Sequence, residues 1–171
     1  DCSNNALKTL DVSHLTKLVN LYCSNNQLTA LDVSSLSELA VLNCFDNQLT
    51  ALDVSNLAKL THLYCNENKL AALDVSGSTE LVVVSCYNNK LTALNVSGLT
   101  NLTKLYCRAN QITALDVSRL PKLDELYCSD NLLTGLVLND SADYSHIDAR
   151  NNYMANESAV TGKNITWDNY R

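Results

Sequence analysis

Seven cysteines are the side chains of this sequence most able to do chemistry, because thiols can bind metal ions or form disulfides. They stand at Cys2, Cys23, Cys44, Cys65, Cys86, Cys107 and Cys128, always 21 residues apart. Zinc sites use closely spaced pairs such as C-x-x-C, and no such pair occurs here. Stacked parallel strands would hold neighbouring Cβ atoms about 4.8 Å apart, beyond the usual disulfide range of about 3.5–4.5 Å. We therefore predict reduced, buried thiols in a structural column, with no metal and no cofactor.

Two polar columns keep the same period and predict turns. An asparagine follows each cysteine by three residues, and we expect its amide to pair with backbone groups of its own coil and of the next one. These structural residues include Asn26, Asn47, Asn68, Asn89, Asn110 and Asn131. A second column contains Asp11, Asp32, Asp53, Asp74, Asn95 and Asp116. It favours Asx turns that accept the N–H of the serine two residues on, although a cation-binding edge stays open as an alternative.

The repeat predicts how these side chains are positioned. Residues 18–39 read L-V-N-L-Y-C-S-N-N-Q-L-T-A-L-D-V-S-S-L-S-E-L, similar to the leucine-rich repeat L-x-x-L-x-L-x-x-N-x-L with Cys for the third Leu. Period-2 alternation around Leu21 and Cys23 indicates a strand, and Leu31 and Val33 indicate another extended segment. The expected fold is a β-rich α/β-type solenoid with a parallel concave sheet, an extended or β convex side, and no true helix in the repeats.

The repeat also predicts the domain organisation. Residues 1–154 should form about eight coils, and residues 155–171, with Trp167, should form a C-terminal capping segment. The chain opens inside a repeat, at Asp1 and Cys2, so we expect that it is a fragment or that a preceding segment covers the first coil in the full-length protein.

Aromatic side chains gather on the side of the expected sheet that points away from the leucine and cysteine columns. We call the outward side of this sheet the aromatic face. Its aromatic members are Tyr22, Phe45, Tyr64, Tyr87, Tyr106 and Tyr127, and its polar members of interest are His62, Lys104, Arg108 and Glu125. Tyrosine also favours half-exposed strands for structural reasons alone. Because Tyr and Arg dominate binding hot spots, we predict that this face contacts a partner.

Composition and spacing argue against several other functions. A net charge of −6 disfavours nucleic acid as the partner. The sequence contains no apolar run of 18 residues, the length needed to span a membrane. No nucleophile lies beside a base in a strained turn, and glycine-rich phosphate loops are absent from the sequence. We therefore expect no enzymatic activity.

The unit L-x-x-L-x-C-x-x-N-x-L-T-x-L-D-V-S-x-L resembles the 21-residue, cysteine-bearing repeats of bacterial cell-wall-attached proteins of the internalin family. The resemblance implies an extracellular adhesin or invasin at the bacterial surface, which binds a host or neighbouring-cell protein or glycoprotein. Two alternatives from other classes remain open, namely a carbohydrate-binding module, because aromatic rings stack on sugars, and a rigid spacer that projects other domains.

Overall fold

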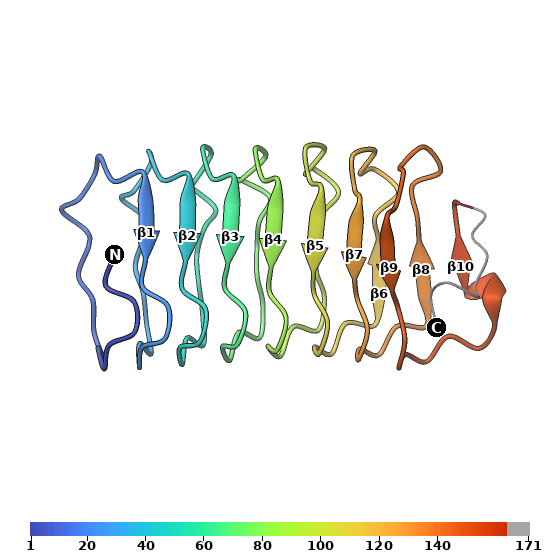
Figure 1. The fold of residues 1–171 in the computed structure, drawn as a ribbon, viewed down its shortest axis with the longest axis horizontal. Coiled ribbons are helices and arrows are strands. Elements are labelled where there is room, and N and C mark those ends of the chain that lie inside the picture. The colour runs from blue at the N-terminus through green and yellow to red at the C-terminus, as the bar shows by residue number, and fades with distance from the viewer. Residues whose placement is uncertain (164–171) are drawn as a thin grey trace.

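The chain winds into a solenoid of stacked coils, shown side by side in Figure 1. A computed structural model describes residues 1–163. One strand from each coil after the first contributes to a seven-stranded parallel sheet in the order β1-β2-β3-β4-β5-β7-β9. These strands are Asn20–Tyr22, Val41–Asn43, His62–Tyr64, Val83–Ser85, Lys104–Tyr106, Glu125–Tyr127 and His146–Asp148. The repeats contain no helix, as predicted; a single 3-10 turn, η1 (Glu157–Ala159), follows them.

The register of the sheet follows the sequence period. Asn20 pairs with Val41, Val41 with His62, and the same step of 21 residues continues along the sheet. Every side chain therefore lies beside its counterpart in the neighbouring coil. This register converts each column of the sequence into a row of the structure.

The opposite side of the solenoid is less regular than the main sheet. A second parallel sheet joins β6 (Ala114–Asp116), β8 (Gly135–Val137) and β10 (Val160–Thr161). In the earlier coils the corresponding segments form no strand, and a single backbone bond links adjacent coils there, for example from Gln27 N–H to the Leu7 carbonyl. The convex side is thus extended throughout, with a β ladder only at its C-terminal end.

Leucines, valines and cysteines fill the space between the two sides. Leu28, Leu42 and Leu63 are fully buried, and with their counterparts in the other coils they form one continuous core cluster along the array. No single coil could bury these side chains, because each one needs a neighbour on both sides. The stability of the fold therefore depends on contacts between coils.

A turn with left-handed backbone geometry follows every strand of the main sheet. The residue two places after each cysteine position has φ between 51° and 59°, and none of these residues is glycine. They are Asn4, Asn25, Asp46, Glu67, Asn88, Ala109, Asp130 and Asn151. Non-glycine residues adopt this conformation at a cost, so the surrounding coil must hold it in place.

One coil departs from the pattern on the convex side. Ser78 stands where other coils have a leucine such as Leu57 or Leu99, and its buried hydroxyl donates to the Val54 carbonyl at 3.1 Å. Beside it, a Cβ atom added to Gly77 would lie 1.8 Å from the Ser55 carbonyl oxygen. The backbone therefore approaches the preceding coil closely at this point, and only glycine fits.

Candidate functional site

The cysteine ladder is part of the core. All seven thiols are free, and the six from Cys23 to Cys128 are fully buried. Burial raises the pKa of the Cys86 thiol from its ordinary value of 9.0 to about 12. Within residues 1–163, no group of three or more His, Cys, Asp or Glu side chains is arranged to hold a metal ion. The ladder thus packs as small apolar groups, as the prediction of reduced cysteines required.

The asparagine column ties consecutive coils together. Asn47 Nδ2 donates to the carbonyl oxygens of Cys44, Phe45 and Cys23, and its Oδ1 accepts the N–H of Leu28 at 2.9 Å. The amide contacts its own coil and the preceding one, whereas we expected its own coil and the next. The turn brings the amide back toward carbonyl groups that the earlier coil leaves without partners.

The aspartate column forms the predicted Asx turns. Asp32 Oδ1 accepts bonds from both the N–H and the hydroxyl of Ser34, at 3.0 and 2.7 Å. The side-chain bond, and then the backbone bond, lower the pKa of Asp32 below its ordinary value of 3.8. Each carboxylate is therefore engaged within its own turn.

The aromatic face lies along the seven-stranded sheet. Tyr22 is 37% exposed, and the other five aromatic residues of the face are half-buried. The columns that carry these residues, at three and one before and one after each cysteine position, are not uniformly exposed. Small residues in the same columns are nearly buried, because side chains on neighbouring coils cover them; they are Ser24, Asn66, Val83, Ser85 and Ser129.

A network of polar and aromatic contacts occupies the C-terminal half of the aromatic face. The carboxylate of Glu125 pairs with Lys104 Nζ at 2.5 Å and accepts the hydroxyl hydrogen of Tyr106 at 2.5 Å. The rings of Tyr106 and Tyr127 lie 5.3 Å apart, and His146 stacks on Tyr127 at 6.4 Å. Burial first, and then Glu125, raise the pKa of Tyr106 above its ordinary value. This cluster is ordered by contacts within the protein.

Arginine and tyrosine pair in the adjacent column. The guanidinium carbon of Arg108 lies 4.8 Å from the centroid of the Tyr87 ring. Burial and the nearby Glu67 carboxylate raise the pKa of Tyr87. Two coils further on, Arg150 forms a bidentate pair with Asp148, with distances of 2.8 and 3.0 Å. Two arginines in one column are therefore held in different ways.

The N-terminal half of the aromatic face carries the remaining predicted site residues. His62 stacks on Tyr64 at 6.3 Å between ring centroids, and its Nδ1 lies 2.9 Å from Thr61 Oγ1. The Thr61 hydroxyl also donates to the Ala40 carbonyl at 2.9 Å, so it links the histidine to the preceding coil.

Sequence reasoning did not select every side chain that orders this face. Glu67 acts on Tyr87, and His146 stacks on Tyr127. The place of His146, 21 residues after Glu125, was a usable signal. No comparable signal in the sequence pointed to Glu67, since this residue lies in the left-handed turn outside the strand columns.

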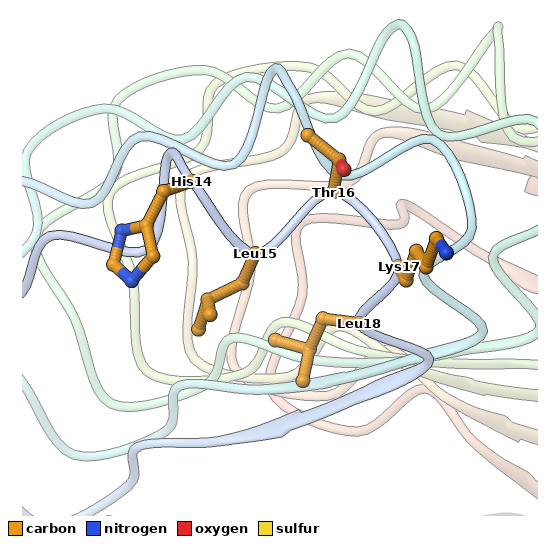
Figure 2. A pocket seen from close by; sticks show the side chains of 5 residues that line it. All are labelled: His14, Leu15, Thr16, Lys17 and Leu18. Carbon is orange, nitrogen blue, oxygen red and sulfur yellow. The ribbon is translucent and has the colours of Figure 1, made fainter.

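A shallow hollow lies at the first inter-coil segment, shown in Figure 2, where His14, Leu15, Thr16, Lys17 and Leu18 line it. Leu15 is 39% exposed, whereas its counterparts Leu36 and Leu57 are fully buried. Those two have a coil on each side, and Leu15 has a coil on one side only. The hollow thus arises because a neighbouring coil packs on only one side of this segment. Its five lining residues do not form a catalytic arrangement.

Comparison with known proteins agrees with this geometry. The sequence profile of the family Leucine Rich repeats (2 copies) matches residues 100–140, and that of the LVIVD repeat matches residues 42–64. Among curated protein sequences, none matches the chain significantly. Within residues 1–163, no helix is long and apolar enough to cross a membrane.

Fold and sequence together define this chain as a leucine-rich repeat array with a cysteine ladder. It is similar to the functional domain of InlJ from Listeria monocytogenes, whose structure includes a cysteine ladder, with 43% identity over 91% of this chain and a TM-score of 0.88. A leucine-rich repeat protein of Leptospira interrogans is 31% identical over 80% of the chain, with a TM-score of 0.74. The chain spans only 35% and 38% of these two relatives.

A plant protein shares the architecture. The leucine-rich repeat ectodomain of the receptor kinase GASSHO1/SCHENGEN3 from Arabidopsis thaliana is 25% identical over 82% of this chain, with a TM-score of 0.71, and the chain covers 19% of it. That ectodomain was solved in complex with CASPARIAN STRIP INTEGRITY FACTOR 2. The same solenoid therefore occurs in bacterial and plant proteins.

Proposed function

We propose that this chain is a non-catalytic protein-recognition and adhesion domain of a bacterial cell-surface protein, and that it binds its partner through the aromatic face. One observation carries the proposal. Six aromatic side chains from six consecutive coils share one side of a rigid sheet and remain partly exposed there. They are Tyr22, Phe45, Tyr64, Tyr87, Tyr106 and Tyr127.

The physical case rests on rigidity and surface chemistry. Tyrosine offers a large contact area with few rotatable bonds, so its immobilisation costs little entropy on binding. The tilted contact of Tyr106 with Tyr127 and the stacking of His62 on Tyr64 reduce that cost further, because these rings are already restrained. An open sheet excludes water poorly, which suits recognition better than catalysis.

The similarity to InlJ supports an extracellular, cell-wall-associated location and a role in virulence or adhesion. The partner would be a host or neighbouring-cell protein or glycoprotein, and the plant ectodomain of this architecture was likewise solved in complex with a partner, CASPARIAN STRIP INTEGRITY FACTOR 2. Residues 1–154 would form the recognition array and residues 155–171 its cap. Trp167 and the rest of 164–171 lie outside the described residues.

A binding screen with two variants tests the proposal. The purified chain is applied to an array of extracellular proteins and to a glycan array. We expect binding to a protein that the double substitution Tyr64→Ala and Tyr106→Ala weakens by about 100-fold or more, since each ring is a hot-spot candidate. The matched control is Tyr153→Ala, which removes a tyrosine that is 70% exposed and lies outside the strands of the sheet.

Each outcome of the screen has a distinct meaning. Circular dichroism of both variants should match the parent, which separates lost contacts from lost structure. Protein binding that is unchanged by the double substitution would refute the aromatic face as the contact surface. Saturable binding to oligosaccharides alone would favour a carbohydrate-binding module, and binding to neither array would favour a rigid spacer.

A further inference from the structure

Charge is distributed unevenly along the aromatic face. Three columns face outward, namely the residues three and one before each cysteine position and the residue one after it. In the coils of β1 to β4, none of these twelve residues carries a formal charge. In the coils of β5, β7 and β9, five of nine do, and they are Lys104, Arg108, Glu125, Asp148 and Arg150.

Four of these five charges are neutralised within the protein. Lys104 pairs with Glu125 at 2.5 Å, and Arg150 forms a bidentate ion pair with Asp148. Arg108 is the exception, because no carboxylate of residues 1–163 lies within 4.0 Å of its guanidinium nitrogens. The face therefore presents one unpaired cation on a protein whose overall charge is −6.

The position of Arg108 favours capture of an anion. Its guanidinium rests over the Tyr87 ring, at 4.8 Å from the centroid, and the side chain remains exposed. A guanidinium on an aromatic surface keeps its N–H groups in one plane, which fits the two oxygens of a carboxylate. Stacking also removes part of the freedom that an arginine would otherwise lose on binding.

We propose that Arg108 is the docking point for an aspartate or glutamate side chain of the partner, and that the uncharged segment next to this carboxylate lies along the coils of β1 to β4. This inference rests on the proposed function and specifies its chemistry. The neutral half of the face disfavours a strongly charged segment, because its three outward columns offer no counter-ion and Glu67, beside Tyr87, borders them only at one turn. The partner segment should accordingly combine one acidic residue with aromatic, aliphatic or small polar neighbours.

Selection from a displayed library of random linear peptides tests this pairing on the full chain. Peptides selected on the parent protein should share an Asp or Glu at one position, with few charges to one side of it. Arg108→Gln should lower the affinity of the protein for those peptides by about 10- to 100-fold, because a charge-assisted bidentate contact is lost. A second selection on Arg108→Glu should yield Lys or Arg at the same position.

Arg150 supplies the matched control. It occupies the same column two coils away, but its guanidinium is already hydrogen-bonded to the Asp148 carboxylate. Arg150→Gln should therefore change peptide affinity by less than about twofold. An equal loss for both substitutions would show a general charge effect and would overturn the carboxylate assignment.

The failure of this inference is distinguishable from the failure of the proposed function. Peptides that lose affinity with Tyr64→Ala but not with Arg108→Gln would refute the docking of a carboxylate and leave the aromatic face standing. Absence of enriched peptides, or enriched peptides indifferent to both substitutions, would contradict both proposals. Arg108-dependent binding of a uronic-acid oligosaccharide, with no peptide enriched, would overturn the assignment of a protein segment.

Discussion

Asn68 joins two coils through its side-chain amide. Its Oδ1 accepts the Leu49 N–H at 2.9 Å, while its Nδ2 donates to the carbonyl oxygens of Cys44 and Cys65 at 3.1 and 3.2 Å. All of these groups are buried. A buried backbone group without a partner costs about 1–3 kcal/mol, so one side chain removes several such costs at once.

Replacement of this amide should destabilise the array. We expect Asn68→Ala to lower the free energy of unfolding by about 3 kcal/mol or more, because Leu49 N–H and at least one carbonyl lose their partners. Urea denaturation measures the loss. Gln48→Ala is the control, since Gln48 is exposed and should change stability by no more than about 0.5 kcal/mol. Similar effects of the two substitutions would contradict a structural role for the column.

The close approach at Gly77 predicts opposite results for two equivalent glycines. Gly77→Ala would place Cβ 1.8 Å from the Ser55 carbonyl oxygen, so we expect a loss of about 1–3 kcal/mol or more in unfolding free energy. Gly98, one repeat later, has no atom within 4 Å of the added Cβ. Gly98→Ala should be neutral or stabilise by up to about 1 kcal/mol. Thermal denaturation of both variants checks the contrast, and equal shifts would refute it.

Buried thiols predict that the fold loses stability in alkali. Cys86 has an ordinary pKa of 9.0, which burial raises to about 12 in the folded chain. Between these values the unfolded chain releases a proton that the folded chain keeps, so unfolding becomes easier as the pH rises. The contribution is fully present below pH 9.0 and is lost as the pH approaches about 12.

The Cys86→Ala variant isolates this effect from other alkaline titrations. Its stability relative to the parent should improve between about pH 8 and about pH 10.5, because it lacks one proton-releasing group. Urea midpoints under reducing conditions measure the difference. A difference that stays constant with pH would show that the thiol titrates alike in both states.

The contact between Tyr106 and Glu125 predicts a change in tyrosine titration. Glu125→Gln removes a negative charge beside the phenol, so the pKa of Tyr106 should fall toward its ordinary value of 10.0, although burial will still hold it above that value. Ultraviolet absorbance of tyrosinate follows the titration. Glu38→Gln is the control, because Glu38 pairs with Lys59 outside the aromatic face. An unchanged curve for Glu125→Gln would refute the contact.

The period of the sequence predicts most of the fold, because a strict spacing leaves little choice of register. The positions of Cys23 and Leu21 in the core follow directly from alternation along a strand. The buried Ser85 could not be predicted in this way, since its exposure depends on the size of the side chains on adjacent coils. Burial by side chains of adjacent coils is set only when the coils stack, so it cannot be read from one repeat.

Contacts within the aromatic face were also beyond the reach of spacing. The columns place Arg108 and Arg150 in equivalent positions, but one stacks on Tyr87 and the other pairs with Asp148. Which contact forms depends on the residues available one coil or two positions away. The close approach of Gly77 to Ser55 likewise occurs in one coil only, since Gly98 in the equivalent position has no atom within 4 Å of an added Cβ.

The constant register of 21 residues has a consequence for how such a chain can change over time. A gene segment encoding one whole turn of the winding can be duplicated or excised in frame, and the flanking turns then meet surfaces of the same kind as before. The rod grows or shortens without any new fit having to arise. Lengthening also adds one more outward row to the aromatic face.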